Sequence, residues 1–200
     1  MQTVTGLYDN YSDAKTAVNA LEDAGISSSD ISIIGRDGEE HDSNAGEGTA
    51  AGAGVGAVVG GTGGLLAGLG MLAIPGVGPV VAAGWLAATA AGAVAGAAAG
   101  GAAGGIIGSL ITSGVDEDDA HVYAEGVRRG STLVSARVED EHVDAARAIL
   151  SDDSAVDVKA RRGVYREEGW ERFDENAPEY TDDDVLKERD RLRQTRDLMP

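Results

Sequence analysis

The sequence predicts an α+β protein, a ferredoxin-like split β-α-β sandwich with an inserted Gly/Ala-rich antiparallel helical hairpin. Strand-helix-strand patterns stand on either side of a central block, at 1–36 and 113–160. The block itself, residues 48–115, contains no Asp, Glu, Lys, Arg or His, and glycine recurs there at every fourth position in two runs. The chain therefore combines a charged domain in two halves with an uncharged insertion.

The first half reads as strand, helix, strand. The β-formers of "QTVTGLY" predict a strand over 2–8, and "DISIIGR" predicts a second over 30–36. Between them, "YSDAKTAVNALEDAG" carries apolar residues at helical spacing, with Ser12 as the expected N-cap and Gly25 as the residue that ends the helix. Residues 37–49 follow as an acidic linker.

The second half repeats the pattern after an additional helix. That helix spans "DEDDAHVYAEGVRRG", with acidic residues in its first turn. Arg128 and Arg129 are expected to complement the dipole at its end, although they also offer charge to an anion. A strand over 131–138, a helix in "DEHVDAARAILSD" and a last strand over 155–160 complete the half.

Each half, at about 36 and about 45 residues, is too small for a core of its own, so the two are expected to fold together. In a ferredoxin-like sandwich the second and third strands are antiparallel neighbours joined by one connection. An insertion between them would leave the sheet and re-enter it at the same edge.

The inserted block, residues 50–112, predicts helices at about 50–73 and 79–112, joined by a reversal at "IPGVGP". Glycine costs a helix roughly 1 kcal/mol relative to alanine, so glycines in register indicate a surface where helices pack closely. The expected helix-packing residues are Gly52, Gly56, Gly60, Gly64, Gly68, Gly92, Gly96, Gly100, Gly104 and Gly108, and the expected turn residues are Pro75, Gly76, Gly78 and Pro79.

Three interpretations of this hairpin are open. A helix over 50–73 is long enough to cross a ~30 Å bilayer core, and Trp85 near the turn suits a membrane interface. Against insertion, residues 87–105 have Val94 as their only large apolar side chain. The hairpin could instead pack on its own domain or in an oligomer, or it could be a flexible low-complexity segment.

The C-terminal part, 161–200, is polar, and "TDDDVLKERDRLRQTR" predicts a short capped helix. Two interpretations stand side by side: a partly ordered, solvated tail, or a docking segment anchored by Trp170 and Phe173.

Composition excludes several functions. A net charge of -18 argues against nucleic-acid binding, and the absence of cysteine excludes disulfides and thiolate chemistry. The N-terminus lacks a signal-peptide pattern, so the charged parts are expected in the cytosol. His41 and His121 lie beside carboxylates from which a weak metal site can be drawn, but acidic linkers and first helix turns are usually only solvated. His142 is expected on the surface, and no histidine is placed to suggest a catalytic triad. The glycine run lacks the context of a dinucleotide fingerprint. We expect no catalytic residue, cofactor or metal.

Four stretches resemble a family of small bacterial stress-induced proteins, the general stress proteins and low-temperature-induced proteins. They are "TVTGLYDNYSDAKTAVNALEDAGISSSDISII", "LGMLAIPGVGPVVAAGWLA", "VDEDDAHVYAEGVRRGSTLVSARV" and "GWERFDENAPEYTDDD". The resemblance implies a ferredoxin-like stress domain with an inserted glycine-zipper hairpin, and expression under stress. It supplies no catalytic residue or ligand.

The leading functional hypothesis is a non-enzymatic stress-response protein that associates with the membrane through the hairpin and with itself as a homo-oligomer, its soluble domain in the cytoplasm. The alternative is a soluble, oligomeric interaction protein whose hairpins pack against each other. A domain that senses a small-molecule ligand of unknown identity is the third possibility.

Overall fold

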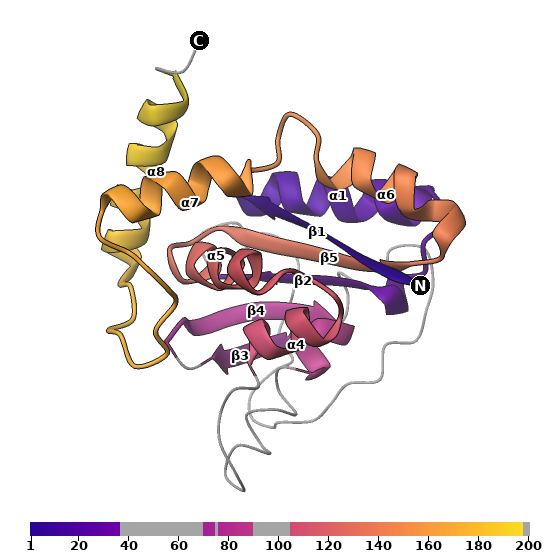
Figure 1. The fold of residues 1–200 in the computed structure, drawn as a ribbon, viewed down its shortest axis with the longest axis horizontal. Helices are drawn as coiled ribbons and strands as arrows, with labels where there is room; N and C mark the ends of the chain where they lie inside the picture. Colours follow the sequence, from indigo (N-terminus) through magenta and orange to yellow (C-terminus); the bar gives the residue numbers. More distant parts are fainter. Residues whose placement is uncertain (37–69, 75, 90–104, 198–200) are drawn as a thin grey trace, which may run out of the picture.

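A computed structural model of the chain describes residues 1–36, 70–74, 76–89 and 105–197 (Figure 1). The strands are β1 (Gln2–Tyr8), β2 (Ile31–Gly35), β3 (Gly70–Ile74), β4 (Gly78–Gly84) and β5 (Thr132–Val138). The helices are α1 (Tyr11–Asp23), α4 (Ile106–Thr112), α5 (Glu117–Arg128), α6 (Val143–Leu150), α7 (Val158–Glu167) and α8 (Asp182–Asp197), with short 3-10 turns η1 (Ser28–Asp30) and η2 (Asp140–His142).

The strands form one antiparallel sheet in the order β1-β5-β2-β4-β3. The α+β class is therefore confirmed. The expected second and third strands, β2 and β5, are antiparallel neighbours with Ile33 opposite Val134. The inserted block adds β4 and β3 beyond β2, so the insertion leaves and re-enters the sheet on the β2 side.

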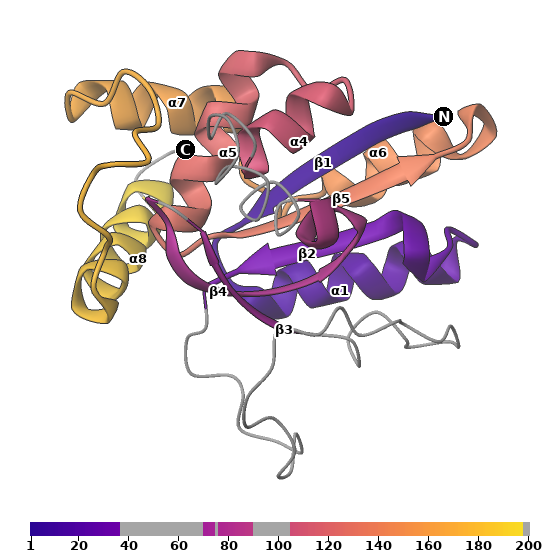
Figure 2. The same ribbon diagram turned by 90° about the horizontal axis from the view of Figure 1, so that it is seen from below.

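Helices cover both faces of this sheet, as Figure 2 shows for α1 on one side and for α4 and α5 on the other. Apolar residues of α1 and α6, among them Leu21 and Leu150, pack in one buried cluster. A second cluster on the opposite face joins Leu110 of α4 and Val127 of α5 to Leu86. Because strand side chains alternate between faces, β2 contributes Ile33 to the first cluster and Ile34 to the second.

The predicted helices at about 50–73 and 79–112 are wrong where the structure describes them between 70 and 84. These residues form the β3–β4 hairpin, in which Leu72 is paired with Val80. Gly76 and Gly78 have φ of +74° and +94°, so the expected reversal is present but joins strands. The strand edge of β2 supplies backbone partners for β4, which a helix over these residues would leave unpaired. Residues 85–89 and α4 are helical as expected.

The predicted last strand over 155–160 is also wrong. Ala155 makes a single antiparallel bridge to Tyr8 on β1, and α7 begins at Val158. Asp157 explains the change, because its carboxylate accepts hydrogen bonds from the backbone N–H groups of Lys159 and Ala160 and so caps a helix. The sandwich is therefore not ferredoxin-like strand for strand: its fourth strand is reduced to one bridge.

The predicted helix ends differ in one cap. Asn10, not Ser12, is the N-cap of α1, since its side chain accepts from the backbone N–H of Asp13 at 2.8 Å. Gly25 ends that helix at φ +86° as expected. Within the described ranges, no helix combines the length and the apolar character that crossing a membrane requires.

Candidate functional site

Within the described residues, buried charged side chains cluster where the end of α5 meets α7 and α8. Nε of Arg129 donates to Oε1 of Glu125 at 2.6 Å, and Nη1 donates to Glu168 at 2.6 Å and Glu188 at 3.2 Å. The guanidinium also lies 4.1 Å from the ring centroid of Tyr165. We call these five residues the arginine cluster; four of them are buried, and Glu168 is exposed at the edge.

Electrostatics keep the arginine cluster charged. Burial by itself lowers the pKa of Arg129, but the hydrogen bond from its side chain to Glu125 and the charge of that carboxylate raise the pKa above its ordinary value. Burial raises the pKa of Tyr165 to about 12, against the lowering influence of Arg161 and Arg129. At neutral pH the cluster therefore holds a permanent guanidinium charge beside a protonated phenol.

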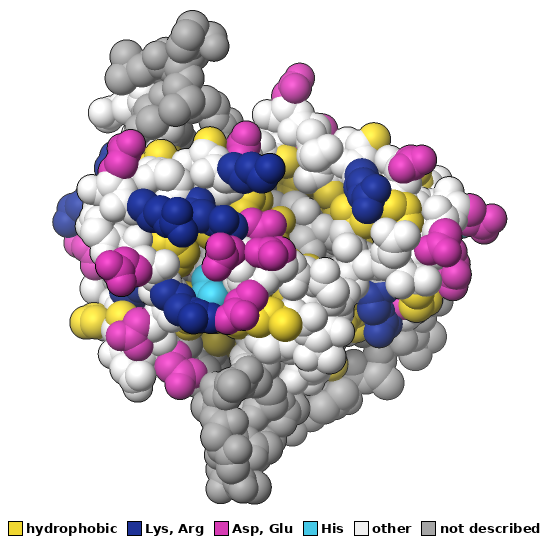
Figure 3. All heavy atoms as spheres, viewed as in Figure 1, with side chains coloured by type: hydrophobic (Ala, Val, Ile, Leu, Met, Phe, Trp, Pro, Cys, Tyr) yellow, Lys and Arg dark blue, Asp and Glu magenta, His cyan; other side chains and the backbone are white. Residues whose placement is uncertain are grey.

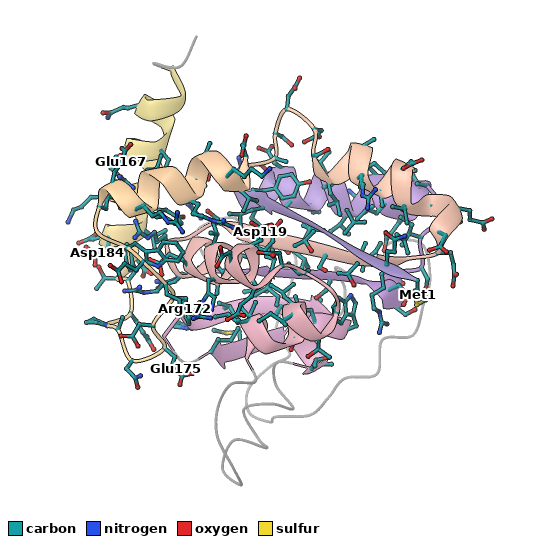
Figure 4. The ribbon with its side chains drawn as sticks, in the orientation of Figure 1. Met1, Asp119, Glu167, Arg172, Glu175 and Asp184 are labelled. Atoms are coloured by element: carbon teal, nitrogen blue, oxygen red, sulfur yellow. The ribbon has the colours of Figure 1, made fainter. Side chains whose placement is uncertain are left out.

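The arginine cluster attaches the C-terminal segment, residues 158–197, to α5 through Glu168 and Glu188. Glu167, Arg172, Glu175 and Asp184 are labelled on this segment in Figure 4. Arg161 of α7 bonds Asp9 at 2.8 Å. Phe173 packs against the core cluster of α4 and α5, and the indole of Trp170 meets Tyr165 edge-on at 5.7 Å. Of the two interpretations drawn from the sequence, the docking segment is the one that this geometry supports.

Helix α8 completes the contact. The side chain of Arg189 donates to the carbonyl oxygen of Gly130, and Val185 lies against that glycine, at which an added Cβ would be 2.3 Å from Val185 Cγ1. Gly130 has φ +103°, so the residue that ends α5 also lets α8 approach closely. On α8, Val185 and Leu192 are buried, whereas Leu186 is exposed.

An open surface hollow lies beside the arginine cluster, between Tyr180 and α8. Charges of both signs line it, and its two arginines are paired: Arg191 with Glu188 at 2.7 Å, and Arg128 with Glu125, which lies outside the lining. The arginines of this region therefore serve internal contacts, because they bind the protein's own carboxylates and, for Arg128, the carbonyl oxygen of Pro178.

The residues predicted from the glycine pattern lie mostly outside the described residues. Gly108 lies in α4, and its carbonyl accepts a hydrogen bond from the Thr112 hydroxyl. Gly76, Gly78 and Pro79 lie at the turn of the β3–β4 hairpin. The predicted residues outside the described ranges are Gly52, Gly56, Gly60, Gly64, Gly68, Pro75, Gly92, Gly96, Gly100 and Gly104.

The histidines occupy different settings. His41 is outside the described residues, and His142 lies on the surface at η2. His121 is buried in α5, where its Nε2 accepts a hydrogen bond from Arg172 at 2.6 Å. A histidine side chain over α5 is visible among basic and acidic side chains in Figure 3. In the part of the chain that the structure describes, no three His, Asp or Glu side chains are grouped to hold a metal ion.

Sequence reasoning missed the partners in the arginine cluster. Arg128 and Arg129 are evident at the helix end. Their carboxylate partners, however, are spread over about sixty residues, from Glu125 to Glu188. Because the chain is rich in Asp and Glu, no single carboxylate could be selected from the sequence. The helix spacing of Glu125 and Arg129, four residues apart, was the one local signal of a pair.

Residues 3–73 match the model of a protein family described as the heat induced stress protein YflT domain. The matched region contains the first of the stretches that resemble the bacterial general stress proteins. Comparison with curated proteins and with solved structures gave no match.

Proposed function

Taking residues 3–73 as a heat-induced stress protein domain, we propose that the chain is a non-enzymatic stress-response protein that acts by self-association in solution. In this proposal the α+β domain is a platform, and the glycine stripes of the inserted block are the surfaces that join copies. The membrane-associated form of the same hypothesis is the competing outcome of the test.

One observation carries the choice of a soluble form. Part of the uncharged block is built into the domain, because β3 and β4 extend its sheet. Ile74, Val80, Leu86, Ile106 and Leu110 are buried in the core cluster on the α5 face. Their apolar surface is thus already covered by the protein, which supports packing of this block on protein in preference to lipid.

Self-association follows from the glycine pattern. A four-residue step leaves a stripe without Cβ atoms along a helix, and such stripes gain stability only when another backbone packs into them. A net charge of -18 makes copies repel each other over the charged surface, so the uncharged block is the favourable place for contact.

The test is the mass of the full chain, purified without detergent and measured by light scattering during size-exclusion chromatography. The wild type should remain in the high-speed supernatant and run as an oligomer. A variant with leucine at four stripe positions should run as a monomer. The substitutions are Gly56→Leu, Gly60→Leu, Gly96→Leu and Gly100→Leu.

Gly163→Leu is the control, because Gly163 is exposed on α7 and an added Cβ there meets no atom within 4 Å. Its mass should equal that of the wild type. An unchanged mass in the four-leucine variant would remove the glycine-stripe argument. A wild type that sediments with membranes and needs detergent would replace self-association in solution with membrane association.

A further inference from the structure

The loop between α7 and α8, residues 168–181, crosses the tip of the β3–β4 hairpin. At Gly76 an added Cβ would lie 2.5 Å from Cα of Glu175, and at Gly78 it would lie 2.9 Å from Oε2 of Glu179. Figure 4 labels Glu175 and Arg172 on this loop. The loop backbone thus touches the hairpin where its two strands join.

Both ends of this loop are hydrogen-bonded to side chains of the domain. Nε of Arg172 donates to Nε2 of His121 at 2.6 Å, and its Nη2 bonds Glu117. At the other end, Nη2 of Arg128 donates to the carbonyl oxygen of Pro178 at 3.0 Å, and Arg36 donates to that of Tyr180. The first attachment differs from the second because its acceptor can titrate.

Nε2 of His121 accepts a hydrogen bond only while the imidazole is neutral. Protonation converts this nitrogen to a donor and places a second positive charge beside the Arg172 guanidinium. Burial lowers the pKa of His121, while the charge of Asp118 acts in the opposite direction. The described residues include no hydrogen-bond partner for Nδ1, so the imidazole has no second attachment there.

The other charged side chains near His121 already form ion pairs. On α5, Glu117 pairs with Arg172, and Asp118 and Asp119 pair with Arg162 of α7. Arg137, the charged residue of β5, pairs with Asp30, and α4 carries no charged or titratable residue. Protonation of His121 therefore bears first on Arg172.

We propose that residues 168–181 form a pH-released strap, in which protonation of His121 detaches Arg172 and frees the tip of the β3–β4 hairpin. The arginine cluster keeps Glu168, at the start of the loop, and α8 attached, so release is confined to the part of the loop between them. The freed surface carries Phe173 from the loop and Val77 from the hairpin tip, both of which pack in the α5-face core in the closed form. The inference does not depend on self-association.

Hydrogen exchange of the full chain tests this proposal at peptides covering 74–80 and 168–181, corrected for the intrinsic effect of pH. Between pH 7.5 and pH 5.5 the wild type should lose protection at both peptides by about tenfold, the effect of losing one hydrogen bond to a charged group. His121→Gln keeps an acceptor that does not titrate, so it should stay protected at both pH values. His142→Gln, at a partly exposed histidine of η2, should behave as the wild type.

Arg172→Ala gives a second, independent arm, because it removes the donor. It should open both peptides already at pH 7.5, with little further change at pH 5.5. The proposal is overturned if His121→Gln loses protection as the wild type does. It is equally overturned if the wild type stays protected at pH 5.5 or if Arg172→Ala remains closed.

Discussion

The Nε atom of Arg129 donates a hydrogen bond to Oε1 of Glu125 across 2.6 Å, one helical turn back in α5, and both side chains are buried. Glu168 and Glu188 reach the same guanidinium from the C-terminal segment. The pair at the end of α5 therefore also holds the C-terminal segment, so weakening the pair should weaken the attachment of that segment.

Glu125→Gln should destabilise the protein by about 3 kcal/mol, because removing one partner of a buried ion pair leaves the other charge less compensated. Urea unfolding at pH 7 measures the change. Glu167→Gln is the matched control: Glu167 is exposed on α7, and its substitution should stay within about 0.5 kcal/mol of the wild type. Equal effects of the two substitutions would show that the pair does not anchor the segment.

Gly76→Ala should do more than strain the backbone. Gly76 and Gly169 both have positive φ, at +74° and +86°, so alanine at either position costs roughly 1 kcal/mol or more. An added Cβ at Gly169 meets nothing within 4 Å, whereas at Gly76 it meets the backbone of Glu175. Limited proteolysis should therefore cleave residues 168–181 faster in Gly76→Ala than in Gly169→Ala; equal rates would argue against a close loop contact.

Stability should fall at alkaline pH as Tyr165 ionises. Its pKa is raised to about 12 by burial, above the value of about 10 in the unfolded chain. A raised pKa contributes stability below pH 10 that is lost as pH rises through 12. Tyr165→Phe should show a smaller loss between pH 10 and pH 12 in urea titrations. Some loss should remain, because burial also raises the pKa of Tyr8 and Tyr123.

Thr181→Ala should fray the start of α8. The Thr181 hydroxyl and backbone N–H both donate to Oδ2 of Asp184, and the Asp184 N–H donates back to that hydroxyl. Loss of such a cap costs about 1 kcal/mol, measurable as reduced helicity and stability. The same two donors lower the pKa of Asp184 below 3.8, and the hydrogen bond from the Thr181 hydroxyl has a larger effect than that from the backbone N–H.

The pH dependence of that cap has a definite sign. With a lowered folded pKa, the cap contributes stability above pH 3.8 that is lost as pH falls through the folded value. In Thr181→Ala, NMR titration should place the pKa of Asp184 nearer its ordinary value. An unchanged Asp184 titration would exclude Thr181 as the cause.

Local patterns predicted the elements whose partners are near in sequence. In α5, Ala120, Tyr123, Ala124 and Val127 recur at helical spacing, and all four are buried. Gly25 and the helix α8 were likewise predicted from caps and periodicity. In each case the signal lies within about four residues, the range over which helix geometry acts.

The failures lie where distant partners decide. Residues 70–73 and 79–84 are uncharged, rich in glycine and alanine, and continuous with the two glycine runs, so the predicted helices were extended through them. The open edge of β2 supplies hydrogen bonds that make them strands. The prediction for residues 155–160 was wrong in the opposite sense, since a strand was expected and a helix begins there. The Asp157 cap favours the helix, and only one bridge to β1 favours a strand.

By itself, then, the sequence determined the α+β class and the glycine positions that mark the hairpin turn. Only the tertiary structure decided that this turn joins strands and that the C-terminal segment lies across it. It also decided that Arg129 serves three carboxylates. These features depend on atoms brought together from distant parts of the chain, and hydrogen bonding and burial at such contacts outweigh local preference.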